Sequence, residues 1–477
     1  MARRRCLRSL RLWPALAAAL LAACTALPLP ELKPPLPPAW RNAPGPSAGQ
    51  PPAPDLHDWW RAFDDPQLAA LVDRALAGNL DLAQAAERFR ASRLLERHAM
   101  DKYRPELKAD TNDVINPDTT ASYFIVGFDA LWELPLFGAA GGTHRIARGD
   151  LDAAAADVRS ARVSLVAEVV RCWIELRSAQ RQEQLLAAIR DADARRLQLL
   201  QVRGKLQLAA PEALAAAEAR LAQDEGALSA PRQAINAIAQ QLAVLLGQAE
   251  PDPAWLQPGA QPRLGPWKLA SVPADLLRTQ PRIAQAEADV LRAAGELDIS
   301  RAEILPHIGI GTSLQWSVNI ARNHRARTGE GIFSLGPVID IPLFDWGQRV
   351  ARKHANDHQL RAAVLAYRQA VLQGVAETET ALGDLHQLGL RETAAKQAAD
   401  ALGRGVAAVR ERATLKLASG LDVQDNLVEQ QRAELELVSA RAAHDLAYVA
   451  LYKALGGAPL PPGDDPATTG QLPRSTP

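Results

Sequence analysis

Residues 123–134 read YFIVGFDALWEL and decide the fold, because apolar side chains recur at every second position. One parity holds Phe124, Val126, Phe128, Ala130, Trp132 and Leu134, and the other holds Tyr123, Gly127, Asp129 and Glu133. Residues 307–317 (HIGIGTSLQWS) and 331–343 (GIFSLGPVIDIPL) alternate in the same way, and 105–114 do so more weakly. Alternation over about ten residues predicts four strands, each with one apolar and one wet face.

A half-buried strand of a soluble sandwich would alternate similarly, so the pattern alone leaves two readings open. The N-terminus favours a membrane strand. Five arginines precede an apolar run from Leu12 to Ala23, which is shorter than the ~20 residues of a spanning helix and predicts an export signal over residues 1–23. It ends in LAAC at 21–24, which resembles a bacterial lipobox and predicts acylation of Cys24; an ordinary cleavage site beside a chance cysteine is the alternative. Thr25 follows, where an Asp often retains lipoproteins in the inner membrane, so we expect the outer membrane.

The rest of the composition points to helices that stand in water. The 477 residues carry 54 basic and 54 acidic side chains, and this balance argues against a nucleic-acid partner. Hydrophobic residues make up 48% but aromatic residues only 5%, which favours long helices with small contact side chains. Periodicity predicts helices near 140–200, 212–246, 348–412 and 421–455, with a coiled-coil seam. They are too polar to lie in lipid.

The second half of the chain repeats the first. Residues 79–85 align with 280–286, 134–137 with 341–344, and 246–247 with 455–456. We therefore predict a signal peptide (1–23), a lipid-anchored Pro-rich tether (24–58), a first repeat (59–250), an inter-repeat linker (251–272), a second repeat (273–457) and a C-terminal tail (458–477).

Four strands cannot close a barrel, and an open sheet edge is excluded from lipid because its unpaired backbone groups cost several kcal/mol each. The smallest membrane barrels need about eight strands, so several protomers must share one barrel, and three copies close it comfortably. The predicted fold class is mainly α with a β membrane part: a long α-helical barrel plus a transmembrane β-barrel formed by a trimer, with four strands per protomer and two internal repeats.

Five segments taken in order resemble the outer membrane efflux lipoproteins, the TolC-like outer membrane factors of tripartite pumps. They are Trp59–Pro66 with Asn79 and Asp81, Phe128–Gly138, Leu276–Glu287, Leu335–Phe344 and Tyr452–Gly457. The resemblance implies an outer membrane channel, anchored by lipid, that passively conducts drugs or other small molecules. It also implies a homotrimer, a periplasmic adaptor protein and an inner membrane transporter of the resistance-nodulation-division type. A type I protein secretion duct and a structural periplasmic coiled-coil lipoprotein are the alternatives.

The sequence offers no chemistry of an enzyme, because nucleophile, phosphate-binding and metalloprotease motifs are absent, and no cofactor is expected. His354 and His358 stand one helical turn apart, but without a third ligand a solvated helix face is the favoured reading and no metal is expected. Phe124, Phe128, Trp132, Trp316 and Phe333 are expected to face lipid.

The turn between the last two helices is the best functional segment. By the resemblance, it lines the narrowest constriction at the periplasmic end. Threefold symmetry would make rings of Asp422 and Asp425, held shut by Arg410 or Arg412. Alternatively, both carboxylates serve only the start of the helix.

Replacing Cys24 by Ser should abolish acylation yet leave a trimer that still inserts, because barrel closure supplies most of the membrane attachment. Metabolic labelling with palmitate tests this. A mature wild-type protein without label would contradict the lipoprotein assignment.

Overall fold

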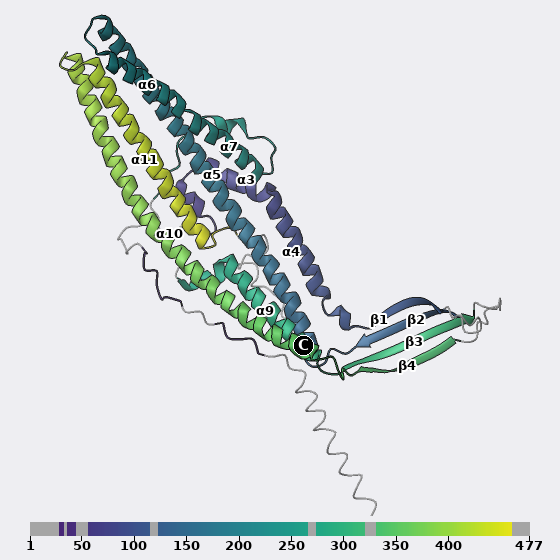
Figure 1. Ribbon diagram of the computed structural model, residues 1–477. Helices are drawn as coiled ribbons and strands as arrows, with labels where there is room; N and C mark the ends of the chain where they lie inside the picture. Colours follow the sequence, from purple (N-terminus) through teal and green to yellow (C-terminus); the bar gives the residue numbers. More distant parts are fainter. Residues whose placement is uncertain are drawn as a thin grey trace, which may run out of the picture. The chain divides into compact units, whose positions relative to one another are not determined.

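A computed structural model describes residues 28–32, 36–43, 56–114, 123–265, 273–319 and 331–459; Cys24 and much of the tether lie outside this range. Its elements, labelled in Figure 1 where there is room, are η1 (Trp59–Phe63), α3 (Pro66–Gly78), α4 (Leu80–His98), η2 (Asp101–Tyr103), β1 (Glu106–Val114), β2 (Tyr123–Glu133), α5 (Ala139–Lys205), α6 (Pro211–Ala227), α7 (Ser229–Leu245), η4 (Pro253–Leu256), η5 (Pro273–Asp275), α8 (Leu276–Thr279), α9 (Pro281–Ala302), β3 (His307–Asn319), β4 (Gly331–Asp340), α10 (Gln348–Thr414) and α11 (Gly420–Ala454).

The chain divides into two compact units. One contains Met1–Pro34, Glu87–Ala156 and Ala284–Ala370, and the other contains Pro35–Ala86, Asp157–Ile283 and Val371–Pro477. The first unit holds the whole sheet, and the second holds the turn between α10 and α11. Each long helix, α5 and α10, contributes residues to both units.

The four strands form one antiparallel sheet in the order β1-β2-β3-β4 (Figure 1). The alternating segments of the sequence are therefore confirmed as strands, including the weakest of them, β1. The first repeat supplies β1 and β2, and the second supplies β3 and β4.

The duplication is visible in the backbone at equivalent turns. A left-handed residue and a left-handed glycine precede each long helix: Phe137 with Gly138, and Trp346 with Gly347. The turns that follow these helices place Gln207 and Lys416 in the same left-handed conformation. Since only glycine adopts positive φ without strain, repetition at matched places supports a duplicated unit.

The last glycine pair of the repeat has a packing role. Gly247 and Gly456 both have positive φ, and each lies against a backbone carbonyl, of Gly78 and of Thr279 respectively. The amide of Asn79 donates to Leu245 O at 3.0 Å, and the amide of Gln280 donates to Ala454 O at 3.2 Å. The same contact thus fastens the end of each repeat to its own first helices.

One helix differs from its sequence-based prediction. The segment predicted as a single helix over 212–246 forms two, α6 and α7, which meet at Leu228. Pro231 has no N–H to donate to the carbonyl of Ala227, so the helical hydrogen-bond ladder is interrupted there. The matching helix of the second repeat, α11, is continuous.

An aromatic cluster forms the core of the second unit. Trp59 is fully buried and stacks on Tyr452 at 5.4 Å between ring centroids, and Phe63 meets Tyr448 edge to face at 5.6 Å. Asp65 caps α3 through the N–H groups of Gln67 and Leu68 and accepts a hydrogen bond from the Trp173 indole at 2.8 Å. These bonds join α3 to α5.

Part of the Pro-rich segment packs on a helix. Glu379 on α10 accepts hydrogen bonds from the backbone N–H groups of Arg41 and Asn42 at 2.6 and 3.0 Å, and nearby Trp40 is buried. In the part of the chain that the structure describes, none of the helices is both long and apolar enough to cross a membrane.

Glycines let α5 and α9 approach closely in the first unit. A Cβ at Gly295 would lie 2.5 Å from the Gly142 carbonyl oxygen, and one at Gly149 would lie 2.9 Å from Ala288 O. Arg145 and Asp298 form an ion pair at 2.6 Å across the same contact, and Asp298 is almost fully buried. Side chains larger than hydrogen are excluded here, so the two helices are fixed at short separation.

Gly295→Ala should therefore destabilise the protein by about 1–3 kcal/mol, because the clash outweighs the gain in helix propensity. Gly405→Ala in α10 is the matched control: a Cβ there meets nothing within 4 Å, so thermal stability should be unchanged or rise. Thermal unfolding followed by circular dichroism in detergent measures both. Equal midpoints for the two variants would contradict the close contact.

Candidate functional site

The register of the sheet sorts its side chains into two faces. On one face, cross-strand rows join Leu107, Ala130, Thr312 and Leu335, and then Ala109, Phe128, Leu314 and Phe333. These rows are apolar yet exposed in the single chain; Phe333 has 66% and Leu335 has 65% of its surface accessible. An exposed apolar patch of this extent marks contact with lipid or protein.

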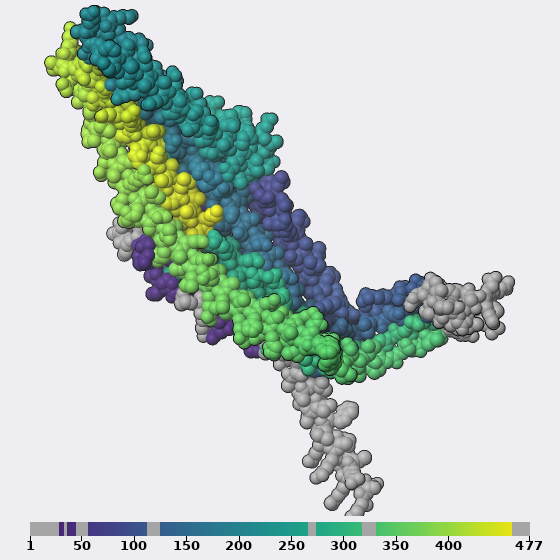
Figure 2. Space-filling view, viewed as in Figure 1, coloured from purple at the N-terminus to yellow at the C-terminus, as the bar shows by residue number. Residues whose placement is uncertain are grey.

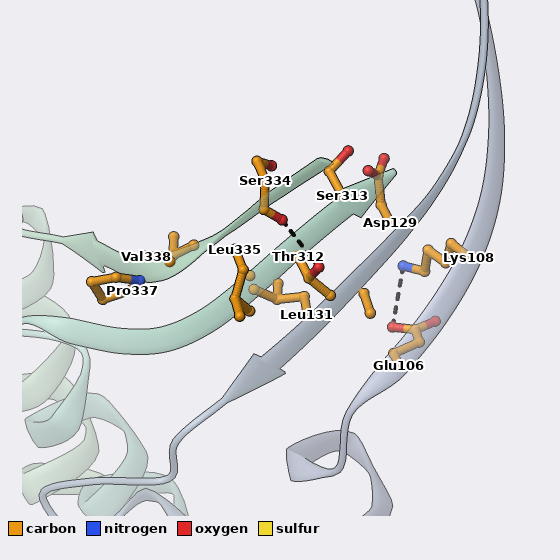
Figure 3. Close-up of a pocket in the computed structure, with 13 residues that line it drawn as sticks. Glu106, Lys108, Asp129, Leu131, Thr312, Ser313, Ser334, Leu335, Pro337 and Val338 are labelled. Atoms are coloured by element: carbon orange, nitrogen blue, oxygen red, sulfur yellow. Dashed lines mark hydrogen bonds and ion pairs between the residues drawn. The ribbon is translucent and has the colours of Figure 1, made fainter. Parts of the chain in front are cut away.

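The opposite face holds the charged side chains, together with Leu131, Ile332 and Val338; we call it the polar face. Its central row joins Lys108, Asp129, Ser313 and Ser334, one residue from each strand. Lys108 Nζ lies 3.2 Å from Glu106 Oε2, and the Gln315 amide donates to Asp129 at 3.5 Å. An open hollow of about 620 Å3 is lined by residues of all four strands and of both faces, and Figure 3 shows Glu106, Lys108 and Asp129 among them.

The residues predicted to face lipid fall on the apolar face. Phe128 and Trp316 contact each other edge to face with ring centroids 6.4 Å apart, and Phe333 lies in the same row as Phe128. Trp132 donates its indole N–H to Tyr103 O at 3.0 Å. Phe124 belongs to β2, but its side chain lies outside the described residues. Contact of these residues with lipid stays a prediction.

The predicted aperture residues lie around the turn between α10 and α11. Asp422 closes a capping box: its N–H donates to Ser419 Oγ at 3.2 Å, and its carboxylate accepts from Ser419 N at 2.7 Å. The hydrogen bonds that Ser419 donates to the carboxylate from its backbone N–H and its hydroxyl, with a smaller contribution from the charge of Arg412, lower the pKa of Asp422 below its ordinary value. Asp422 thus stabilises the start of α11. Its place at an aperture stays a prediction.

Asp425 has a partner that the sequence did not suggest. Arg196 on α5 places Nε 3.1 Å from Asp425 Oδ1, whereas Arg412 donates to Leu417 O at 3.3 Å. No local motif pairs Arg196 with Asp425, because they are far apart in sequence and meet only when α5 and α11 pack together. Figure 2 shows how closely the helices on either side of the α10–α11 turn pack.

Behind this ion pair lie two carboxyl groups, one buried (Asp193) and one half-buried (Asp224). Arg196 Nη1 is 3.7 Å from Asp193 Oδ1, and the Asp193 side chain is only 4% exposed. Burial, and next the hydrogen bond and negative charge of Asp193, raise the pKa of Asp224 on α6 to about 6. Each of the two carboxyl groups therefore disfavours the charged form of the other. Asp224, Asp193, Arg196 and Asp425 therefore form a continuous chain from α6 through α5 to α11.

The histidine pair shows no sign of a metal site. His354 and His358 are both exposed on α10. Across the described ranges, no three His, Cys, Asp or Glu side chains are arranged to hold a metal ion. Cys172 is buried, and desolvation raises the pKa of its thiol to about 12, which makes it a poor nucleophile.

Sequence comparison places the chain among exporters. A family model described as "Outer membrane efflux protein" matches residues 71–248 and 272–457. The chain is 27% identical over 468 residues to the pyoverdine export outer membrane protein OpmQ of Pseudomonas aeruginosa, covering 92% of this chain and 94% of OpmQ. It is also 27% identical to the toluene efflux pump outer membrane protein TtgI of Pseudomonas putida, over 83% of this chain and 86% of TtgI.

Solved structures agree. The outer-membrane channel OprN superposes with a TM-score of 0.76 at 25% identity, covering 90% of this chain and 99% of OprN. The CmeC outer membrane channel of Campylobacter jejuni superposes with a TM-score of 0.78 at 17% identity, over 94% and 97% of the two chains. The likeness confirms the predicted fold class, a long helical barrel with a transmembrane β-barrel that a trimer shares.

The carboxyl pair predicts a pH dependence. A pKa raised in the folded state means that the native protein holds a proton that the unfolded chain releases, so this pair costs stability progressively as pH rises from about 4 to about 6. Asp224→Asn should therefore raise the thermal midpoint at pH 7.5 and leave it unchanged near pH 3.5. Glu218→Gln, at an exposed position of α6, is the control and should change neither. A loss of stability in Asp224→Asn at pH 7.5 would contradict the raised pKa of Asp224.

Proposed function

Because this chain belongs to the outer membrane efflux protein family and is the outer membrane channel of a tripartite efflux pump, we propose that its sheet forms one third of the barrel wall. The apolar face, with Phe128 and Phe333, then meets lipid, and the polar face, with Lys108 and Asp129, lines the bore. The observation that carries the proposal is that the strand register puts the charged side chains on one face and Phe128, Trp132, Trp316 and Phe333 on the other.

The two sheet edges support this assembly. Within the described residues, β1 and β4 each pair on one side only. A membrane-embedded edge needs a partner strand, because lipid offers no hydrogen bonds. Joining β4 of one protomer to β1 of the next, three times, satisfies every edge and makes a barrel of twelve strands, within the range of known outer membrane barrels.

The cargo and the partners follow from the duct design. Relatives whose names refer to pyoverdine and toluene export small molecules, which favours small-molecule efflux over protein secretion or a purely structural lipoprotein. A passive duct selects little by contact, so an inner membrane transporter, of the resistance-nodulation-division type in our proposal, chooses the cargo, and a periplasmic adaptor connects the two. Conduction requires no catalytic group.

The N-terminal region fits an anchored channel. In our proposal residues 1–23 are removed, Cys24 carries lipid, and residues 24–58 tether it to the first repeat (59–250). Support comes from Arg41 and Asn42, whose backbone N–H groups donate to Glu379 on α10, next to the buried Trp40. Residues 251–272 then link to the second repeat (273–457), and 458–477 form the tail.

We place the closed aperture at the turn between α10 and α11, with Asp422 and Asp425 near the threefold axis. Like charges brought together there repel unless a cation or an arginine neutralises them. Arg196 neutralises Asp425 within the same chain at 3.1 Å, and the charge of Arg412 acts on Asp422. Arg410 is the remaining candidate partner, across the interface. The ion pair between Arg196 and Asp425 also connects α11 to α5. In our proposal, closure of the aperture and packing of these two helices therefore depend on the same contact.

Replacing both Asp422 and Asp425 by Ala should raise the conductance of the isolated protein in planar bilayers and weaken cation block from the periplasmic side. Arg196→Gln should raise conductance as Asp425→Ala does, and the two together should be less than additive, since they remove one interaction. Arg410→Ala and Arg412→Ala test the other partners.

Ser419→Ala is the control for the helix start. It removes about 1 kcal/mol of capping without changing charge, so conductance should stay at the wild-type value. Unchanged conductance and cation block in the double aspartate variant would limit both carboxylates to starting α11.

A further inference from the structure

Two adjoining hollows of the second unit share three arginines. The first, of about 990 Å3, lies between the start of α3, the helices α5 and α11, and residues 259–265 of the predicted linker. The second, of about 700 Å3, lies between α5, α10 and α11. Arg181 on α5, Arg263 in the linker and Arg441 on α11 line both hollows, and all of the lining residues belong to the second unit. The three arginines thus converge from three different elements on one place.

The lining carries more cations than carboxylates. Four carboxylates stand against six cationic side chains, which are Arg177, Arg181, Arg263, Lys396, Arg404 and Arg441. Arg181 Nη2 lies 3.1 Å from Glu434, and Arg441 Nε lies 3.0 Å from Glu392. In the part of the chain that the structure describes, Arg263, Lys396 and Arg404 contact no carboxylate, and all three are exposed. Their donors are therefore available to an anion from solution.

Arg177, at the base of the larger hollow, is a second and independent sign of an anion site. Only 4% of its surface is exposed, yet its guanidinium donates to neutral oxygens alone: Gln180 Oε1 at 2.8 Å, Gln257 O at 2.7 Å and Gln67 Oε1 at 3.1 Å. It lies 4.1 Å from the centre of the Trp173 ring. Among the described residues no carboxylate contacts it, and burial lowers its pKa.

A buried cation without a contacting counter-ion is costly, so the fold maintains positive charge at this place against a free-energy penalty. The linker is fitted closely over that charge. A Cβ at Gly259 would lie 2.6 Å from the guanidinium carbon of Arg177, so glycine is the residue that lets the backbone pass there. The positive charge is therefore built into the floor of the hollow, and the exposed arginines stand at its rim.

We infer that the two hollows form a binding site for an organic anion with two or more carboxylate or phosphate groups. Guanidinium groups bind both kinds of anion through paired, charge-assisted hydrogen bonds. Arg181, Arg263 and Arg441 stand where the hollows join, so a ligand that extends into both can place one acidic group on either side of them. A single small ion would fill little of this space.

The ligand would connect parts of both repeats. Arg181 belongs to the first repeat, Arg404 and Arg441 belong to the second, and Arg263 belongs to the linker between them. An anion held by all of them binds the folded chain and not the unfolded one, so it stabilises the packing of α5 against α10 and α11 by mass action. The inference does not depend on the sheet forming a barrel.

Isothermal titration calorimetry of the purified full chain in detergent, at neutral pH and constant ionic strength, tests the site. Citrate probes a carboxylate ligand, pyrophosphate probes a phosphate ligand, and acetate is the monovalent control. We expect saturable binding of citrate, of pyrophosphate or of both, and none of acetate. The Arg263→Gln, Arg404→Gln double variant should weaken this binding by about tenfold or more, because it removes two charge-assisted contacts. Both side chains are exposed, so the variant should fold.

Arg368→Gln is the matched control, since Arg368 is exposed on α10 but lines neither hollow. It should bind the probes as the wild type does. Saturable binding of one probe alone would identify its acidic group as the one that the site takes. Absence of binding for both probes would overturn the site, and so would equal affinities in the wild type and the double variant. An equal loss in Arg368→Gln and the double variant would also overturn it, because the anion would then respond only to overall charge.

Discussion

The hydrogen-bonding need of the sheet edges governs the rest of the structure. The four strands hydrogen-bond to one another within the chain. In the described residues, β1 and β4 each pair along one side only. In water such edges are tolerable, whereas in lipid each unpaired group costs several kcal/mol. In the proposed barrel the exposed apolar face with Phe128 and Phe333 meets lipid, so the sheet edges must be covered by other copies of the chain. The trimer and the shared barrel meet this requirement, and in the proposed barrel the polar face lines the bore.

The helical part obeys a different constraint, that of close packing between repeated elements. Gly247 and Gly456 lie against the carbonyls of Gly78 and Thr279, and Gly142 and Gly295 allow α5 to touch α9. Small residues at fixed places set the helix separation, while polar side chains connect helices from distant parts of the chain. The chain from Asp224 through Asp193 and Arg196 to Asp425 is of this kind, and it joins the proposed aperture to α5 and α6. Opening of such a duct must therefore change the packing between helix pairs as well as the charges at the turn.

The sequence predicted those features that depend on local periodicity. Alternation in 123–134, 307–317 and 331–343 located β2, β3 and β4, and the repeated segments predicted two equivalent halves. Prediction was less successful where distant elements meet. The pairing of Arg196 with Asp425 could not be predicted, since periodicity says which face of a helix is polar but not which neighbour it meets. The break at Leu228 was predictable in principle from Pro231, which cannot continue the hydrogen-bond ladder.

The central claim, that one face of the sheet meets lipid and the other meets water, is tested most directly by electron paramagnetic resonance of nitroxide labels. Single cysteines at successive positions from Phe128 to Trp132 of β2 would carry the label in membrane-reconstituted protein; Cys172 is buried and does not compete. Oxygen, which partitions into lipid, should relax labels at Phe128, Ala130 and Trp132, and a water-soluble nickel chelate should relax those at Asp129 and Leu131. Accessibility without this alternation, or with the two sets reversed, would contradict the account.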